Sequence, residues 1–238
     1  MLTDYFRQLQ EDVGCIRARD PAATSLLEIM LLYPGLKAVR SHRKANWFYH
    51  HKMPFVARYI SQRSARKTNI EIHPGATIGR RFFIDHGTGV VIGETAEIGD
   101  DVTIYQGVTL GGTGKDVGKR HPTVGNHVMI GAGAKVLGPF KIGDNTKIAA
   151  GSVVLNEIPE NCTAVGTPAR VVRQNGLRVD YLDQVDIPDP VLHEMIQMQE
   201  QIDLLKTELQ VLKKTMEKEN RKECAGAESE TTPAGDNK

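Results

Sequence analysis

Two short stretches of the sequence each place a histidine beside a second charged side chain. The first, "DHGTG", contains Asp85 and His86, and the second, "GGTGKDVGKRHP", contains Arg120 and His121. An imidazole can accept a proton near neutral pH, and a neighbouring carboxylate can orient it and stabilise the imidazolium. A guanidinium can bind a carboxylate through paired hydrogen bonds. The residues alone leave two alternatives: Asp85 as a turn cap and Arg120 as a solvated loop charge.

The elements that must position these residues show an unusual period. Aliphatic residues recur every six positions, often followed by glycine, at 72, 78, 84, then 92, 98, 104, 110, then 124, 130, 136, 142, 148 and 154. Neither a helix nor an ordinary strand has period six, whereas a short strand plus a tight turn does. Each unit cannot bury its aliphatic side chain alone, so the pattern predicts stacked coils with a continuous core.

The period breaks at the two histidine-bearing stretches. The step from Ile84 to Ile92 is eight residues, and the step from Leu110 to Val124 is fourteen. The register of a stacked core cannot absorb extra residues, so insertions must leave at corners as loops, where functional groups tend to lie. His86 and His121 are therefore the histidines that we expect to be functional.

Residues 1–66 have apolar residues at helical spacing, interrupted by "YPG" at 33–35. In "RDPAA", Asp20 and Pro21 have the types of a helix cap and a first helical residue. We expect a helical domain over 1–66 and a catalytic coil domain over 67–178.

Beyond residue 178, apolar residues from Val191 to Met216 alternate steps of four and three with polar flanks, which is a heptad seam. The pattern favours a coiled-coil helix over 179–220, with a single amphipathic helix packed on its own domain as the alternative. Residues 221–238 are expected to be disordered.

Composition excludes several classes of protein. Thirty basic side chains balance 29 acidic ones, which argues against a nucleic-acid partner. The three cysteines have no paired spacing, so a disulfide framework is not expected and a reducing cytoplasm is. The sequence has neither a signal peptide nor a membrane-spanning apolar run, so no membrane partner is expected.

The hexapeptide pattern resembles the hexapeptide-repeat acyltransferases, which implies a left-handed parallel β-helix with three hexapeptides per coil. The strings "DPA", "IHPGATIG", "DHGTGVVIGETA", "VTLGGTGK", "KRHPTVG", "IGAGAKVLG" and "GTPAR" are similar to those of the serine O-acetyltransferase family over about residues 19–173. The resemblance implies acetyl transfer from acetyl-CoA to the hydroxyl of L-serine, the first step of cysteine biosynthesis.

By position, the resemblance makes His86 the general base and Asp85 its orienting partner. Arg120 and His121 would hold the serine carboxylate, and Asp20 the serine ammonium. Glu71 of "EIHP" stands where the family usually has aspartate, and it joins the substrate-binding set. Glu94 is expected to be structural.

The co-substrate is acetyl-CoA, and the chemistry needs donors for an oxyanion rather than a metal. The backbone of Gly112 could supply a donor or bind the CoA arm. Ala132 and Ala150 are eighteen residues apart, one coil of this fold, and would leave a shallow strip for pantetheine. Lys147 is the candidate for a CoA phosphate, because Lys135, Lys141 and Lys147 fall at successive corners.

With three repeats per coil, His86 and His121 fall at different corners of one chain. They could meet only across an interface between neighbours, which predicts a homotrimer with shared sites, with pairing into a dimer of trimers open. L-Cysteine is the expected feedback inhibitor. Family members often end in an isoleucine that docks into O-acetylserine sulfhydrylase, whereas this sequence ends "GDNK", so such docking is not expected.

Three other functions fit parts of the sequence. A γ-type carbonic anhydrase would bind zinc through His86, His121 and His127, because three histidines suit a catalytic zinc. Another hydroxyl acceptor would keep the transferase chemistry, and a non-catalytic trimeric scaffold would keep only the fold. The match of the two histidine-bearing stretches favours the serine acetyltransferase interpretation.

Overall fold

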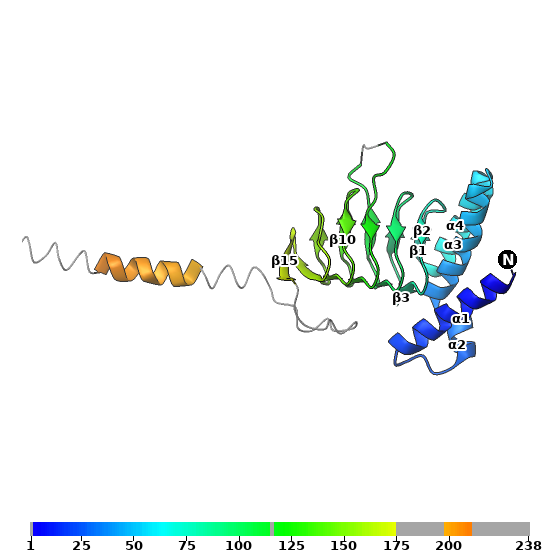
Figure 1. Ribbon diagram of the computed structural model, residues 1–238, viewed down its shortest axis with the longest axis horizontal. Helices are drawn as coiled ribbons and strands as arrows, with labels where there is room; N and C mark the ends of the chain where they lie inside the picture. The colour runs from blue at the N-terminus through cyan, green and yellow to red at the C-terminus, as the bar shows by residue number, and fades with distance from the viewer. Residues whose placement is uncertain (1, 115–116, 175–197, 211–238) are drawn as a thin grey trace, which may run out of the picture. The chain divides into compact units, whose positions relative to one another are not determined.

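The computed structural model describes residues 2–114, 117–174 and 198–210. The chain divides into two compact units, Met1–Pro190 and Val191–Lys238. In the first unit, four helices precede a stack of short strands (Figure 1). The helices are α1 (Leu2–Arg19), α2 (Leu26–Leu32), α3 (Pro34–His50) and α4 (Pro54–Thr68).

The strands form a left-handed parallel β-helix with three sheets. Sheet A contains β1 (Ile70–Ile72), β4 (Val90–Ile92), β7 (Thr109–Gly111), β10 (Lys135–Leu137) and β13 (Val153–Val154). Sheet B contains β2 (Thr77–Ile78), β5 (Glu97–Ile98), β8 (Thr123–Val124) and β11 (Lys141–Ile142). Sheet C contains β3 (Phe83–Ile84), β6 (Thr103–Ile104), β9 (Met129–Ile130), β12 (Lys147–Ile148), β14 (Cys162–Gly166) and β15 (Ala169–Gln174).

From β1 to β13, each strand pairs in parallel with the strand three places away along the chain, so three strands make one coil. At the end of the stack, β14 pairs in parallel with β12, and β15 pairs antiparallel with β14. The aliphatic residues of the six-residue period point inward, and all but the partly buried Ile78 are at most 4 % exposed. Burying one such side chain contributes roughly 1.5–3 kcal/mol, so the ladder of these residues is the main source of the coil's stability. The predicted stacked core is confirmed.

The strand register shows where the two insertions leave. Ile130 pairs with Ile148 eighteen residues on, which is the regular coil. Ile72 pairs with Ile92, and the two extra residues leave between β3 and β4. Ile98 pairs with Val124, and the eight extra residues leave between β7 and β8. We name the edge of sheet A that follows sheet C the C/A corner, and the edge that precedes sheet B the A/B corner.

The helices pack directly on the first coil. Ala38 and Val39 of α3 join the coil's apolar core, while Ile16 of α1 packs with Phe83 of β3. At Gly35 a Cβ would lie 2.2 Å from the carbonyl oxygen of Ile84, so only glycine allows α3 to approach β3 this closely. This contact fixes the helices relative to the strands that carry the histidines.

Of two sequence-based expectations about the helical region, one is confirmed and one is wrong. The break at "YPG" is confirmed, because α2 ends at Leu32 and Pro34 is the first residue of α3. The expectation that Asp20 and Pro21 begin a helix is wrong. Asp20 follows the end of α1, its Oδ1 accepts from the Ala22 amide at 2.8 Å, and Ser25 caps α2 instead. The Asp20 side chain forms a turn, which competes with helix capping.

Within the second unit, residues 198–210 are helical. The rest of the predicted coiled coil over 179–220 and the predicted tail over 221–238 lie outside the described residues. None of the described helices has the length and hydropathy that crossing a membrane requires.

Candidate active site

The two histidines lie at opposite edges of sheet A. His86 is at the C/A corner just before β4, and the ring of His121 packs on Gly93, just after β4. A three-residue strand spans about 10 Å. The structure therefore separates the two imidazoles within one chain, as the repeat count predicts.

The extra residues of the C/A corner expose His86. Later coils turn this corner with one left-handed glycine, such as Gly107 or Gly133, whereas the first coil uses His86 at φ 56° together with Gly87 and Gly89. The His86 side chain is 75 % exposed. A left-handed conformation is uncommon for a residue with a Cβ, but Asp101 and His127 also adopt it at another corner, so the conformation alone does not single out His86.

Asp85 approaches His86 without a described hydrogen bond. Its Oδ1 lies 3.9 Å from His86 Nε2, which is longer than a hydrogen bond. Burial raises the pKa of the Asp85 carboxyl, His86 opposes that shift, and the charge of Asp20 adds to it. Asp20 and Asp85 therefore act on one another electrostatically beside an exposed imidazole.

Asp20 is held by a tyrosine that the sequence did not single out. The hydroxyl of Tyr33 donates to Asp20 Oδ2 at 2.6 Å. Burial raises the pKa of the Tyr33 hydroxyl, and the hydrogen bond to Asp20 raises it further. Two carboxylates, Asp20 and Asp85, are thus available to an ammonium group near His86.

His121 at the other edge is buried and has a fixed tautomer. Its Nδ1 accepts from the Thr95 amide at 3.1 Å, so the proton of the neutral ring lies on Nε2. Burial lowers the pKa of His121, and the positive charge of Arg120 lowers it further. Both effects favour the neutral ring, whose Nε2–H is a donor that suits an anion.

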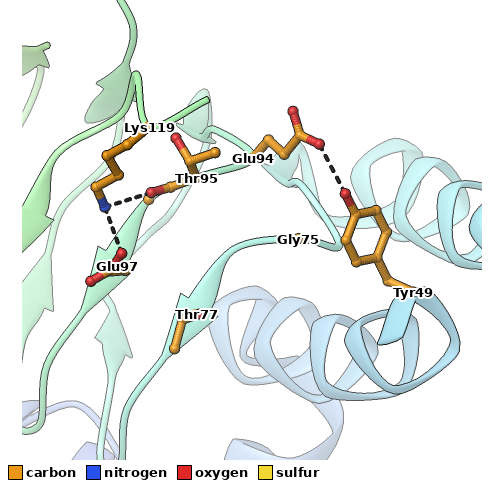
Figure 2. Close-up of a pocket in the computed structure, with 8 residues that line it drawn as sticks. Tyr49, Gly75, Thr77, Glu94, Thr95, Glu97 and Lys119 are labelled. Carbon is orange, nitrogen blue, oxygen red and sulfur yellow. Dashed lines mark hydrogen bonds and ion pairs between the residues drawn. The ribbon is translucent and has the colours of Figure 1, made fainter. Parts of the chain in front are cut away.

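Arg120 forms an ion pair with Glu94. The Arg120 Nη2 donates to Glu94 Oε2, and the Tyr49 hydroxyl of α3 donates to Glu94 Oε1 at 2.9 Å. The Tyr49 and Arg120 hydrogen bonds hold the pKa of Glu94 below its usual range. Figure 2 shows Tyr49 and Glu94 meeting between α3 and the coil.

A pocket of about 320 Å³ opens beside this pair (Figure 2). Lys119 crosses it and donates to the Thr95 carbonyl at 2.7 Å and to Glu97 at 2.8 Å. These contacts fasten the end of the inserted arm to sheet B, and Arg120 and His121 follow directly. The C-terminal end of the arm is thus anchored on the coil.

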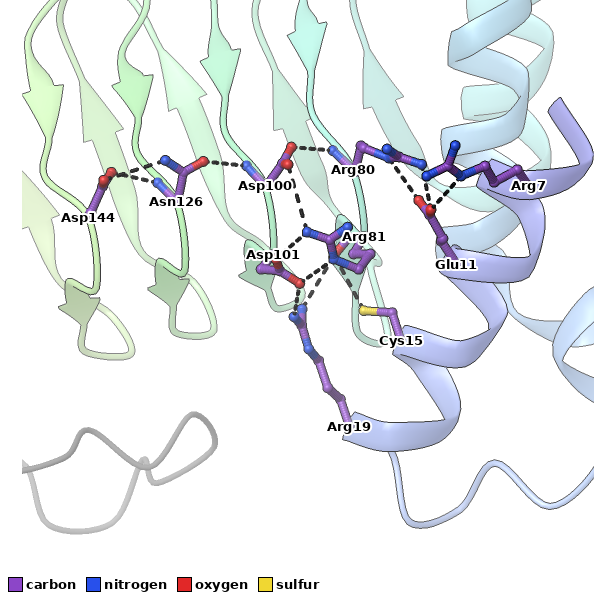
Figure 3. A network of polar contacts seen from close by, with 10 residues as sticks. All are labelled: Arg7, Glu11, Cys15, Arg19, Arg80, Arg81, Asp100, Asp101, Asn126 and Asp144. Atoms are coloured by element: carbon purple, nitrogen blue, oxygen red, sulfur yellow. Dashed lines mark hydrogen bonds and ion pairs between the residues drawn. The ribbon is translucent and has the colours of Figure 1, made fainter. Parts of the chain in front are cut away.

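A polar network fixes the end of α1, and with it Asp20. Arg19 donates to Asp101 at 3.1 Å, and Arg81 also binds Asp101 (Figure 3). Arg19 donates to Thr103 as well, at 2.9 Å. The Arg81 hydrogen bond lowers the pKa of Asp101. The residue that follows Arg19 is therefore held at a defined place beside the coil.

Glu71 lies between the two edges of sheet A. It pairs with Val91 across β1 and β4, and its neighbours Ile70 and Ile72 point into the core, so its side chain points outward. Its Oε1 accepts from Gln62 at 3.4 Å.

The residues predicted to bind CoA are divided among three places. Ala132 and Ala150 stack at the C/A corner, where the Gly151 amide donates to the Ala132 carbonyl at 2.8 Å. The same kind of backbone hydrogen bond links the next turns at this corner: the Gly133 amide donates to Gln106 and the Gly107 amide to Thr88, which lies in the turn that contains His86. We call this row of stacked turns the column. The other two candidates lie elsewhere: Gly112 is at the base of the arm and Lys147, 8 % exposed, begins β12 in sheet C.

The three lysines spaced six apart begin β10, β11 and β12, one in each sheet, so they do not form a ridge. Across residues 2–114, 117–174 and 198–210, no group of three His, Cys, Asp or Glu side chains could hold a metal ion. His127 lies at the corner between sheets B and C, which neither His86 nor His121 occupies.

The sequence reasoning missed Tyr33, Tyr49 and Thr95, and it treated Glu94 as structural. Glu94 and Thr95 directly follow β4 in "GETA", where a signal was present because they flank the strand that separates the histidines. The tyrosines carried no signal, because their contacts depend on how the helices pack on the coil.

Comparison with known proteins relates the chain to one family of enzymes. Residues 121–156 match the family model described as bacterial transferase hexapeptide (six repeats). Serine acetyltransferase of Bacillus subtilis (strain 168) is 56 % identical over 207 residues, which is 87 % of this chain and 95 % of that protein.

Two solved structures are similar to the fold. Serine acetyltransferase from Brucella abortus strain S19 in complex with coenzyme A is 43 % identical, with a TM-score of 0.71 over 74 % of this chain and 70 % of that one. A serine acetyltransferase in complex with cysteine is 43 % identical, with a TM-score of 0.72 over 76 % and 71 %. On this identity over most of its length, the chain belongs to the serine acetyltransferase family of hexapeptide-repeat acyltransferases.

Proposed function

We propose that this chain acetylates serine at a site between two subunits of a homotrimer. The transferase reaction itself follows from the family: the acetyl group of acetyl-CoA passes to the hydroxyl of L-serine, which gives O-acetyl-L-serine and CoA in cysteine biosynthesis. The comparisons give no support to a carbonic anhydrase or to a different acceptor.

The observation that carries the shared site is that the two histidines lie at opposite ends of one strand, β4. His86 and His121 flank β4 at opposite edges of sheet A, so one chain cannot bring their rings together. Threefold packing of the triangular coil would set the C/A corner of one subunit against the A/B corner of its neighbour. A closed site then contains His86 of one chain and His121 of the next.

His86 is the general base of this proposal. It accepts the proton of the serine hydroxyl as that oxygen attacks the thioester carbonyl, and it returns the proton to the CoA thiolate that leaves. Its exposure at the corner supports this role, because the ring is free to reach a substrate. A positioned base contributes about 10²–10⁴-fold to the rate.

The charged groups around the histidines fit the two ends of the amino acid. Asp20 and Asp85 would bind the serine ammonium, with Asp85 also near enough to influence His86. Arg120 and the Nε2–H of His121 would bind the carboxylate of a serine held between subunits. Glu71, on the outer side of sheet A between the corners, would contact the same substrate or orient His86.

The CoA arm would follow the column of Ala132 and Ala150, which leads along the C/A corner toward His86. The backbone amide of Gly112, at the base of the arm, would donate a hydrogen bond to the oxyanion or to the CoA arm. Lys147 begins β12 in sheet C, so it would bind a CoA phosphate only if that phosphate lies at the edge of sheet C. L-Cysteine shares the ammonium and carboxylate of serine. It would therefore compete for the serine site and act as a feedback inhibitor, in line with the related structure that contains cysteine.

The His86→Ala variant tests the role of the base. We expect turnover, measured as CoA thiol released from acetyl-CoA and L-serine, to fall at least about a hundredfold. Oligomer mass and acetyl-CoA binding should be unchanged, because the side chain is exposed and packs on little. Turnover within a few fold of the parent enzyme would contradict the assignment.

A further inference from the structure

We propose that Tyr49 and Glu94 are positioning residues that aim Arg120 at the substrate carboxylate. This inference rests on the proposed function, in which Arg120 binds the carboxylate of serine. It gives a role in the reaction to a helix, α3, that contributes no residue to the histidine-bearing corners.

The contacts divide the two oxygens of Glu94 between two partners. Tyr49 donates to Oε1 at 2.9 Å, and Arg120 donates to Oε2. The carboxylate therefore cannot rotate without losing one of them. One of the guanidinium's five N–H donors is used in this way, which restricts the position of Arg120 and leaves the other donors for a second carboxylate.

Tyr49 is itself held in place by its surroundings. Its ring packs edge-on against His73, with ring centroids 5.9 Å apart and an interplanar angle of 81°. It is the penultimate residue of α3, whose other end contacts β3 through Gly35. The order of contacts thus runs from the helical domain through Tyr49 and Glu94 to Arg120.

Glu94 could act on Arg120 in two opposite ways. It could orient the guanidinium, which would strengthen carboxylate binding, or it could neutralise its charge, which would weaken it. The side chains of Glu94 and Arg120 are each about one-third exposed, so water screens part of the charge, whereas the hydrogen-bond geometry is kept. The partial exposure favours orientation, and the two effects predict opposite changes in KM.

Steady-state kinetics of the Tyr49→Phe variant test the proposal, because this change removes the hydroxyl and keeps the ring. We expect KM for L-serine to rise about three- to tenfold, the effect of one ordinary hydrogen bond, because Tyr49 acts on serine only through Glu94 and Arg120. KM for acetyl-CoA should not change, and kcat should stay within about twofold. Tyr5→Phe is the matched control, because Tyr5 accepts from Arg40 at 3.1 Å within the helical domain.

A substrate comparison separates positioning from general loosening. L-Serinamide lacks the carboxylate, so the preference for serine over serinamide in kcat/KM should shrink in Tyr49→Phe and stay unchanged in Tyr5→Phe. In a Glu94→Gln background, Tyr49→Phe should add little, because both changes break the same chain of contacts.

The outcomes distinguish the inference from the function on which it rests. A parent enzyme that does not acetylate serine would overturn the proposed function. A normal or lowered KM for serine in Tyr49→Phe, with an active parent, would overturn only the positioning role. Full additivity with Glu94→Gln would show that Tyr49 does not act through Glu94, and would overturn it as well.

Discussion

At the scale of single residues, the two histidines of the proposed site have different surroundings and therefore different chemistry. His121 is buried, its Nδ1 accepts from a backbone amide, and burial lowers its pKa, which favours the neutral ring with an Nε2–H donor. His86 lies in a left-handed turn, and its side chain is 75 % exposed. Identical side chains are thus suited to anion binding in one case and proton transfer in the other.

A third histidine, His42, links stability to pH. It is 5 % exposed in α3, and burial lowers its pKa to about 4. In the unfolded chain it takes a proton near pH 6.5 while the folded chain does not. Stability from this residue is therefore complete above pH 6.5 and is lost as the pH falls from there to about 4.

The His42→Gln variant should show a flatter pH dependence of the unfolding free energy. The parent loses up to about 1.4 kcal/mol per pH unit through this residue in the window from pH 6.5 to 4.5, and the variant should lack that loss. Denaturant unfolding at several pH values, at one protein concentration, measures both slopes. Equal slopes would show that His42 does not titrate as proposed.

At the scale of elements, the ends of β4 determine where the functional groups lie. The strand is three residues long. The turn before it contains His86, and the turn after it contains Gly93, against which the His121 ring packs. At Gly93 a Cβ would lie 2.1 Å from His121 Nε2. The absence of a side chain there is what allows the imidazole to pack against the coil.

The Gly93→Ala variant should displace His121 and weaken serine binding. We expect KM for serine to rise about tenfold or more, because small misplacements of binding groups cost this much. KM for acetyl-CoA is the internal reference. Gly14→Ala in α1, where a Cβ meets nothing within 4 Å, is the control and should leave both constants unchanged. A parental KM for serine in Gly93→Ala would refute this role.

The elements also show how far the sequence predicts the structure. The six-residue period gave the coil core and both insertion corners, because each buried aliphatic residue repeats a local rule. It did not give the Tyr33–Asp20 and Tyr49–Glu94 contacts, since these join segments 13 and 45 residues apart through helix packing. The helix start expected at Asp20 failed because its side chain bonds to the local backbone instead.

At the scale of the whole molecule, the proposed function divides the site into two halves that one chain carries at different corners. The C/A corner holds His86 and the column of Ala132 and Ala150, and the A/B corner holds His121 and the inserted arm. Closed threefold symmetry would complete three sites from three copies of each half. The central claim is therefore that catalysis requires residues from two chains.

Activity of mixed oligomers tests this claim most directly. His86→Ala and Arg120→Ala/His121→Ala chains with different tags are co-expressed, and oligomers that carry both tags are purified. Each variant alone should be nearly inactive. Every trimer that carries both tags contains one pair of intact halves among its three sites. About a third of the sites should therefore be complete, and serine acetylation should recover to about that fraction of the parent activity. Mixed oligomers as inactive as either variant alone would contradict a site shared between chains.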